Sequence, residues 1–60
     1  MICCEVCGSN VEYIIISAEP RFRTAQKIFF VCGKDSCRQR ITDYIKERGE
    51  IVGAVFRRIK

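Results

Sequence analysis

The chain has 60 residues, among them five cysteines and no histidine, and 11 Lys and Arg against seven Asp and Glu give it a formal charge of +4. A chain of this length forms one domain, residues 1–60, and buries only about 60% of its unfolded surface, so a disulfide framework or a metal must add stability. No apolar run approaches the roughly 18 residues that span a membrane, Tyr13–Ile16 being far too short, and the N-terminus lacks the features of a signal peptide. We therefore expect an intracellular, cytoplasmic protein with reduced thiols and no membrane attachment, in which paired cysteines favour a metal over disulfides.

Four of the cysteines form two pairs, Cys4-x-x-Cys7 and Cys32-x-x-x-x-Cys37. Structural zinc sites are tetrahedral and are closed by cysteine and histidine ligands with short spacings inside each pair. Because the chain has no histidine, a closed site must be all sulfur, and the spacing predicts one structural Zn²⁺ per chain. Cys3 is left over: it either replaces Cys4 as a ligand or is a partly buried small hydrophobic residue.

The first half of the chain predicts a knuckle turn followed by a β-hairpin. Gly8 allows the positive φ that a tight turn after the first cysteine pair requires. Residues 11–17 are rich in β-branched and aromatic residues, which is typical of a strand, and Pro20 interrupts this pattern. Residues 26–32 are expected to form the return strand, which delivers Cys32 at its end.

The second half predicts a helix and a last strand. Ser36 and Gln39 have the spacing of a capping box, and Gly49 is placed where a helix ends, so we expect a helix over residues 36–48 with Cys37 in its first turn. Three apolar residues recur at helical spacing and are expected to face the core: Ile41, Tyr44 and Ile45.

Residues 50–60 predict a final strand with a basic end. Its apolar part, Ile51–Phe56, either completes a three-stranded sheet with the hairpin or lies at an exposed edge. An exposed edge would invite a partner strand, in a homo-oligomer or a larger assembly.

The positive charge is one-sided, because all Lys and Arg residues lie from Arg21 onward. Four thiolates around one divalent zinc carry a net charge of −2, which lowers the formal +4 to +2. A one-sided basic surface suits a polyanionic partner, and a solvated surface that keeps the protein soluble is the plain alternative.

Phe22 lies between Arg21 and Arg23 at the expected hairpin tip. An aromatic ring flanked by cations suits base stacking beside phosphate contacts. The alternatives are a phenylalanine folded over the small core or an anchor in a protein interface. The residues expected to contact nucleic acid are Arg21, Phe22, Arg23, Lys27, Lys34, Arg38, Arg57 and Arg58.

The layout of a Cys-x-x-Cys-Gly knuckle, a hairpin and a second pair whose last cysteine opens a helix resembles the treble-clef zinc fingers. Within them, Cys4-Glu5-Val6-Cys7-Gly8 with Ile28-Phe29-Phe30-Val31-Cys32 and Cys37 is similar to the TRASH-type fingers. That family includes a small zinc-finger protein of the archaeal and eukaryotic large ribosomal subunit, together with metal-sensing and DNA-associated modules. The likeness covers roughly residues 4–45. The second pair here encloses four residues where that family usually has three, and the final strand is additional.

These observations predict a small α+β zinc-stabilised domain, a treble-clef-like finger with a knuckle, a hairpin, a helix and a C-terminal strand. The expected function is a nucleic-acid-binding module, with RNA or a ribonucleoprotein favoured. The alternative is an adaptor that docks on a larger protein complex through its hairpin and C-terminal strand. We expect no enzyme, because the sequence offers no catalytic set, and Cys4-x-x-Cys7 lacks the preceding strand of dithiol oxidoreductases.

Overall fold

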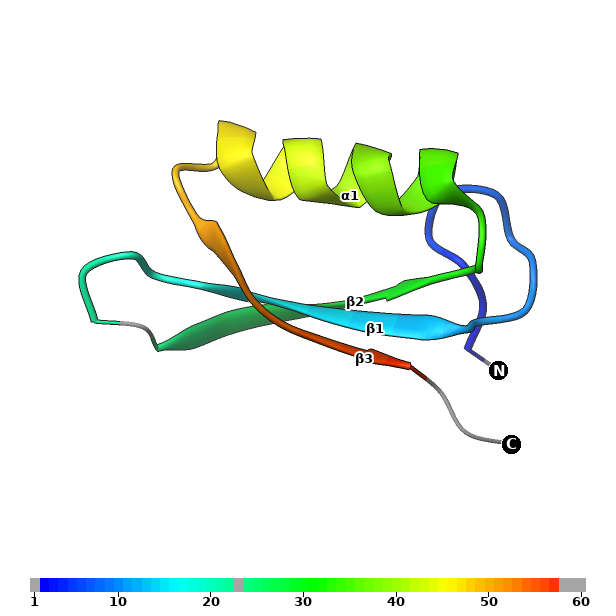
Figure 1. The fold of residues 1–60 in the computed structure, drawn as a ribbon, viewed down its shortest axis with the longest axis horizontal. Helices are drawn as coiled ribbons and strands as arrows, with labels where there is room; N and C mark the ends of the chain where they lie inside the picture. The colour runs from blue at the N-terminus through cyan, green and yellow to red at the C-terminus, as the bar shows by residue number, and fades with distance from the viewer. Residues whose placement is uncertain (1, 23, 58–60) are drawn as a thin grey trace.

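The computed structural model describes residues 2–22 and 24–57 and consists of one antiparallel sheet with a helix on one face (Figure 1). The elements are β1 (Tyr13–Ala18), β2 (Ala25–Val31), α1 (Asp35–Glu47) and β3 (Ile51–Arg57). The strand order is β2-β1-β3. β1 and β2 form the hairpin, and β3 pairs with the opposite edge of β1. The predicted small α+β fold and its order of elements are confirmed.

The core lies between α1 and the face of the sheet that the helix covers. Directly paired residues of an antiparallel sheet point to the same side, so Ile15 of β1 shares this face with Phe29 of β2. Ile41 and Ile45 of the helix contact them, as the helical spacing predicted. The cluster of buried residues is Cys4, Ile15, Phe29, Val31, Cys32, Cys37, Ile41 and Ile45, with Tyr13 and Val52 packed against it. Three of the four paired cysteines are therefore part of the core.

Helix α1 begins one residue before the predicted start, and the expected capping box is wrong. Its N-cap is Lys34, which makes no side-chain cap hydrogen bond, so Ser36 lies inside the first turn. Asp35 supplies the negative charge that suits a helix N-terminus. Cys37 lies in the first turn, as predicted.

The helix ends in a glycine turn. Gly49 has a φ of +79°, and the Glu50 N–H donates to the Ile45 carbonyl at 3.1 Å, which closes the last turn. The predicted core position of Tyr44 is wrong, because this residue is 43% exposed. Its ring meets Phe29 edge-on at 5.9 Å between centroids, so Tyr44 borders the core without entering it.

The other face of the sheet carries apolar side chains, and no described element covers it (Figure 1). The pairing places Phe30, Ile14 and Phe56 in one row across the three strands and Ile28, Ile16 and Ala54 in the next. We call these six residues the uncovered face. Ile28 is 51% exposed and Phe56 is 55% exposed, while the other four are half-buried by their neighbours in the sheet.

The two edges of the sheet differ. At the β2 edge, the Glu5 N–H donates to the Phe30 carbonyl at 2.9 Å, and the Phe30 N–H donates to the Glu5 carboxylate at 2.8 Å. β3 pairs with β1, which confirms the expectation that it completes the three-stranded sheet, and it forms the other edge of that sheet. β3 spans Ile51–Arg57, and the last three residues of the predicted strand, 58–60, lie outside the described residues. No helix of the described residues is long and apolar enough to cross a membrane.

Candidate metal centre

The structure brings together the four cysteines that the spacing predicted. The Sγ atoms of Cys4, Cys7, Cys32 and Cys37 all lie within 4.8 Å of one another. Cys7 is exposed and the other three are buried. The four thiols are therefore positioned to bind one metal ion at the end of the molecule where the knuckle meets the start of α1.

The first pair is held by a tight turn. The Gly8 N–H donates to the Cys4 carbonyl at 2.9 Å, and Gly8 has a φ of +80°, the left-handed conformation that the sequence predicted. The Val6 N–H lies 3.4 Å from the Cys4 sulfur and donates to it. The turn thus directs both sulfurs towards the second pair and stabilises negative charge on Cys4.

The second pair links the sheet to the helix. Cys32 follows directly after the last residue of β2, and Cys37 lies in the first turn of α1. Helix N-termini carry partial positive charge, which favours a thiolate at this position. The sheet and the helix therefore each contribute one ligand from a fixed end, and the loop between them spans the site.

The geometry fits zinc. A tetrahedral zinc ion with Zn–S bonds of about 2.3 Å places its sulfur ligands about 3.8 Å apart. The Cys7 and Cys32 sulfurs are 3.5 Å apart, and no pair in the group exceeds 4.8 Å. Four thiolates also form the donor set that zinc prefers in closed structural sites. A zinc ion bound here would cross-link the knuckle, β2 and α1.

The surroundings of Cys4, Cys7 and Cys37 shift the pKa values of these thiols in different directions. The Ser9 hydroxyl, 3.3 Å from the Cys7 sulfur, the Ser9 backbone and Cys32 lower the pKa of Cys7 to about 6. Burial raises the pKa of Cys4, but the backbone N–H groups of Cys7, Val6 and Cys32 more than offset it, so the pKa is lowered. Burial, together with the neighbouring thiols, raises the pKa of Cys37 to about 12. A bound cation would favour the ionised form of all four groups.

Cys3 is not part of the cluster, so the alternative in which it replaces Cys4 is wrong. It pairs with Asn10 in an isolated antiparallel bridge, and its side chain is exposed. The expectation of a partly buried Cys3 is therefore also wrong. The extended backbone at this position points Cys4 inward and leaves Cys3 outside.

The residues expected to contact nucleic acid lie in separate places. Arg21 and Phe22 are at the hairpin tip, whereas Lys34, Arg38 and Arg57 are at the metal end of a molecule 33 Å long (Figure 1). Phe22 is 76% exposed, so its core interpretation is wrong. Arg23 and Arg58 lie outside the described residues.

Two of the cations expected to contact phosphate interact with side chains of the same chain. The Arg38 guanidinium is 4.6 Å from the centre of the Tyr13 ring and forms an ion pair with Asp35. The Lys27 ammonium lies 5.1 Å from the centre of the Phe29 ring. Both cations therefore cover apolar surface in addition to facing solvent.

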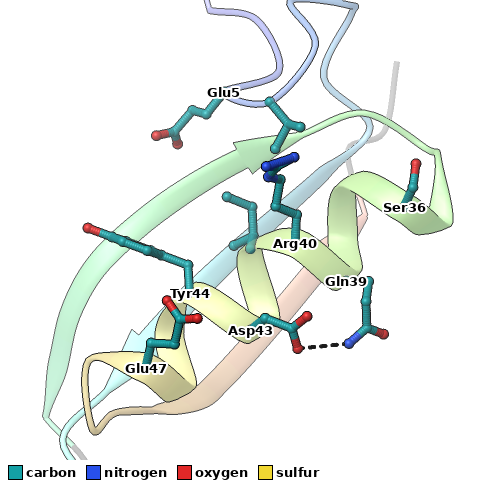
Figure 2. A pocket seen from close by; sticks show the side chains of 9 residues that line it. Glu5, Ser36, Gln39, Arg40, Asp43, Tyr44 and Glu47 are labelled. Atoms are coloured by element: carbon teal, nitrogen blue, oxygen red, sulfur yellow. Dashed lines mark hydrogen bonds between the residues drawn. The ribbon is translucent and has the colours of Figure 1, made fainter.

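An open groove runs between the knuckle and the outer side of α1 (Figure 2). Gln39 donates to Asp43 at 2.9 Å within it. The groove is lined by Glu5, Val6, Ser36, Gln39, Arg40, Ile41, Asp43, Tyr44 and Glu47. Three carboxylates against one guanidinium make it acidic on balance, so this side of the helix does not suit a phosphate backbone.

Comparison with known proteins finds no matching family model, no matching curated protein and no matching solved structure. The resemblance to TRASH-type fingers therefore stays a prediction. What can be said of function comes from the geometry of the chain itself: the cysteine cluster, the uncovered face and the distribution of charge.

Proposed function

We propose that this chain is a zinc-stabilised, non-enzymatic interaction module of the treble-clef type, and that it binds protein through the uncovered face. The observation that carries the proposal is the pair of apolar rows across the three strands, with Ile28 and Phe56 each more than half exposed. Large contiguous apolar patches on a folded chain mark interaction sites, whereas isolated apolar residues need no explanation. This proposal develops the adaptor alternative of the sequence analysis.

Zinc has a structural role in the proposal. With one ion per chain held by the four cysteines, the site contributes on the order of 10–16 kcal/mol to folding. That stabilisation permits so small a chain to keep six apolar side chains out of its core. The convergence of the four sulfurs within 4.8 Å supports this role.

The charges of the face favour protein over nucleic acid. Binding to single strands combines stacking surfaces with cations that follow the backbone, and the uncovered face has aromatic rings but no charged residue among its six members. The row beyond it is also uncharged and consists of Ala25, Ala18 and Ile51.

Nucleic-acid binding, with RNA favoured, is the second candidate. It is supported by Phe22, which is 76% exposed beside the exposed Arg21 at the hairpin tip, and by the formal charge of +4. Titration with single-stranded RNA and duplex DNA at several salt concentrations tests it. Binding that weakens steeply with salt and is lost in Phe22→Ala would support it, and binding weaker than millimolar at low salt would exclude it.

The protein-binding proposal is tested with two matched variants. Ile28 and Val55 are each 51% exposed, but Ile28 belongs to the uncovered face and Val55 pairs with Ile15 on the helix side. Tagged wild-type, Ile28→Lys and Val55→Lys proteins are used to capture partners from nuclease-treated extract of the source cells. We expect wild type and Val55→Lys to retain the same stoichiometric protein and Ile28→Lys to lose it. Retention by all three would contradict the proposal.

A further inference from the structure

We infer that the partner on the uncovered face is a second copy of this chain, packed face to face with the first. The inference rests on the proposed function, since it names the protein that this face binds. It places the sheets of two copies together in the centre, with the two helices outside.

The lack of charge on this surface favours a second copy. In a two-fold dimer the same patch meets itself, so any charge near its centre lies close to an identical charge. The two rows of the uncovered face, Phe30-Ile14-Phe56 and Ile28-Ile16-Ala54, contain only apolar side chains. Such a surface is self-complementary. It also suits a chain with a positive formal charge, which zinc lowers from +4 to +2, because none of the six side chains brings a charge into the contact.

The area of the face is that of a small, weak interface. Three strands spaced about 4.8 Å apart and about six residues long give a face of about 14 by 20 Å. Two such faces bury roughly 600 Å² in plan, which is below the roughly 1,200 Å² at which stable interfaces begin. This area fits a reversible dimer of a small domain. An obligate complex, which buries about 2,000 Å² or more, would need a larger surface.

The two strand edges are less suited than the face to pairing with a second copy. At the β2 edge, Glu5 occupies both backbone groups of Phe30, so that edge is blocked at the metal end. The β3 edge is bent by a bulge, because Ile16 pairs with Ala54 and Ser17 with Val52, leaving Gly53 as an extra residue. Bulges disfavour continuous pairing at an edge. The face therefore offers the larger regular surface.

The experiment is sedimentation equilibrium of the zinc-loaded protein between about 5 μM and 1 mM, a range chosen for a weak interface. The chain has a mass of 6.9 kDa, so face-to-face pairing predicts an average mass that rises with concentration towards twice that value. In Ile28→Lys the dissociation constant is expected to rise at least tenfold, because a charge would enter the apolar contact. Val55→Lys, on the helix side of the edge strand β3, is expected to dimerise like wild type. Zinc content and circular dichroism must match wild type in both variants.

The other outcomes separate the inference from the proposed function. A wild-type protein that stays monomeric to 1 mM overturns the inference. If Ile28→Lys then still loses a captured partner, the proposed function stands with a different protein on the face. A dimer that Val55→Lys disrupts and Ile28→Lys does not would overturn the face-to-face arrangement in favour of pairing through the β3 edge.

Discussion

The sulfur atoms of Cys7 and Cys32 lie 3.5 Å apart although 25 positions separate the two residues in the chain. Between them the chain forms the whole hairpin, so the metal site closes the loop that contains two of the three strands. Closing a loop of this length costs entropy, which a small core offsets only in part. Binding of one metal ion at this point would therefore couple the knuckle, the sheet and the helix into one folding unit.

Serine substitutions should distinguish the four cysteines that bind metal from Cys3, which lies outside the cluster. Cys37→Ser removes a buried sulfur of the cluster and is expected to abolish stoichiometric zinc binding and most of the helical circular dichroism. Cys3→Ser changes an exposed thiol outside the cluster and should leave both unchanged. Zinc counted by native mass spectrometry checks the pair. Equal zinc loss in the two variants would show that Cys3 takes part in the site.

Two phenylalanines offer a matched test of the core. Phe29 is 2% exposed and contacts the helix, so Phe29→Ala should lower the free energy of unfolding by about 3–5 kcal/mol. Phe22 is 76% exposed at the hairpin tip, and Phe22→Ala should change it by less than about 0.5 kcal/mol. Denaturant unfolding of the zinc-loaded proteins measures both. A large loss in Phe22→Ala would mean that the tip folds over the core in solution.

The turn after α1 should tolerate only glycine without strain. Gly49 has a φ of +79° and no atom within 4 Å of an added Cβ, so Gly49→Ala introduces backbone strain without a clash. We expect the free energy of unfolding to fall by about 1 kcal/mol. Lys46→Ala, at an exposed position of the same last turn, is the control and should change it by less than about 0.5 kcal/mol. Equal effects would argue against the left-handed turn.

Zinc affinity should fall as the pH falls, because every ligand must be a thiolate. The Ser9 hydroxyl stabilises the Cys7 thiolate and helps to lower its pKa to about 6, so Cys7 is ionised at neutral pH and protonates as the pH drops through about 6. Ser9→Ala should raise this pKa and weaken zinc binding about tenfold, with the larger effect at low pH.

Competition with a chromophoric chelator between pH 5.5 and 8 measures this prediction. Ser36→Ala, at an exposed position in the first turn of α1, is the control and should retain wild-type affinity. An unchanged pH profile in Ser9→Ala would show that the hydroxyl does not act on the thiolate.

Much of the fold could be predicted because cysteine spacing and hydrophobic periodicity are local signals. The two pairs identified the cluster, and the β-branched runs identified β1 and β2 to within two residues. Local patterns could not identify the N-cap of α1. The helix begins at Asp35, directly after the loop that follows Cys32, so the capping-box spacing of Ser36 does not set its start. Nor could they show that Tyr44 borders the core, because the sheet under α1 is only three strands wide.

The uncovered face has a signal in the sequence. Ile14 and Ile16 flank Ile15, and Phe30 stands between Phe29 and Val31, so both strands are apolar without alternation. This pattern is typical of strands buried on both faces. A chain with one predicted helix can cover only one face of the sheet, so this pattern would predict a partner for the second face. Recognising this requires the fold and the pattern to be considered together.

The central claim is that one zinc ion, held by the four cysteines, is what keeps this chain folded. Native mass spectrometry with and without a strong chelator, combined with circular dichroism of the same samples, tests it most directly. We predict one zinc ion per chain, and loss of helix and sheet signals when the ion is removed. A chain that keeps its folded spectrum after complete removal of zinc, or that carries no zinc while folded, would contradict the account.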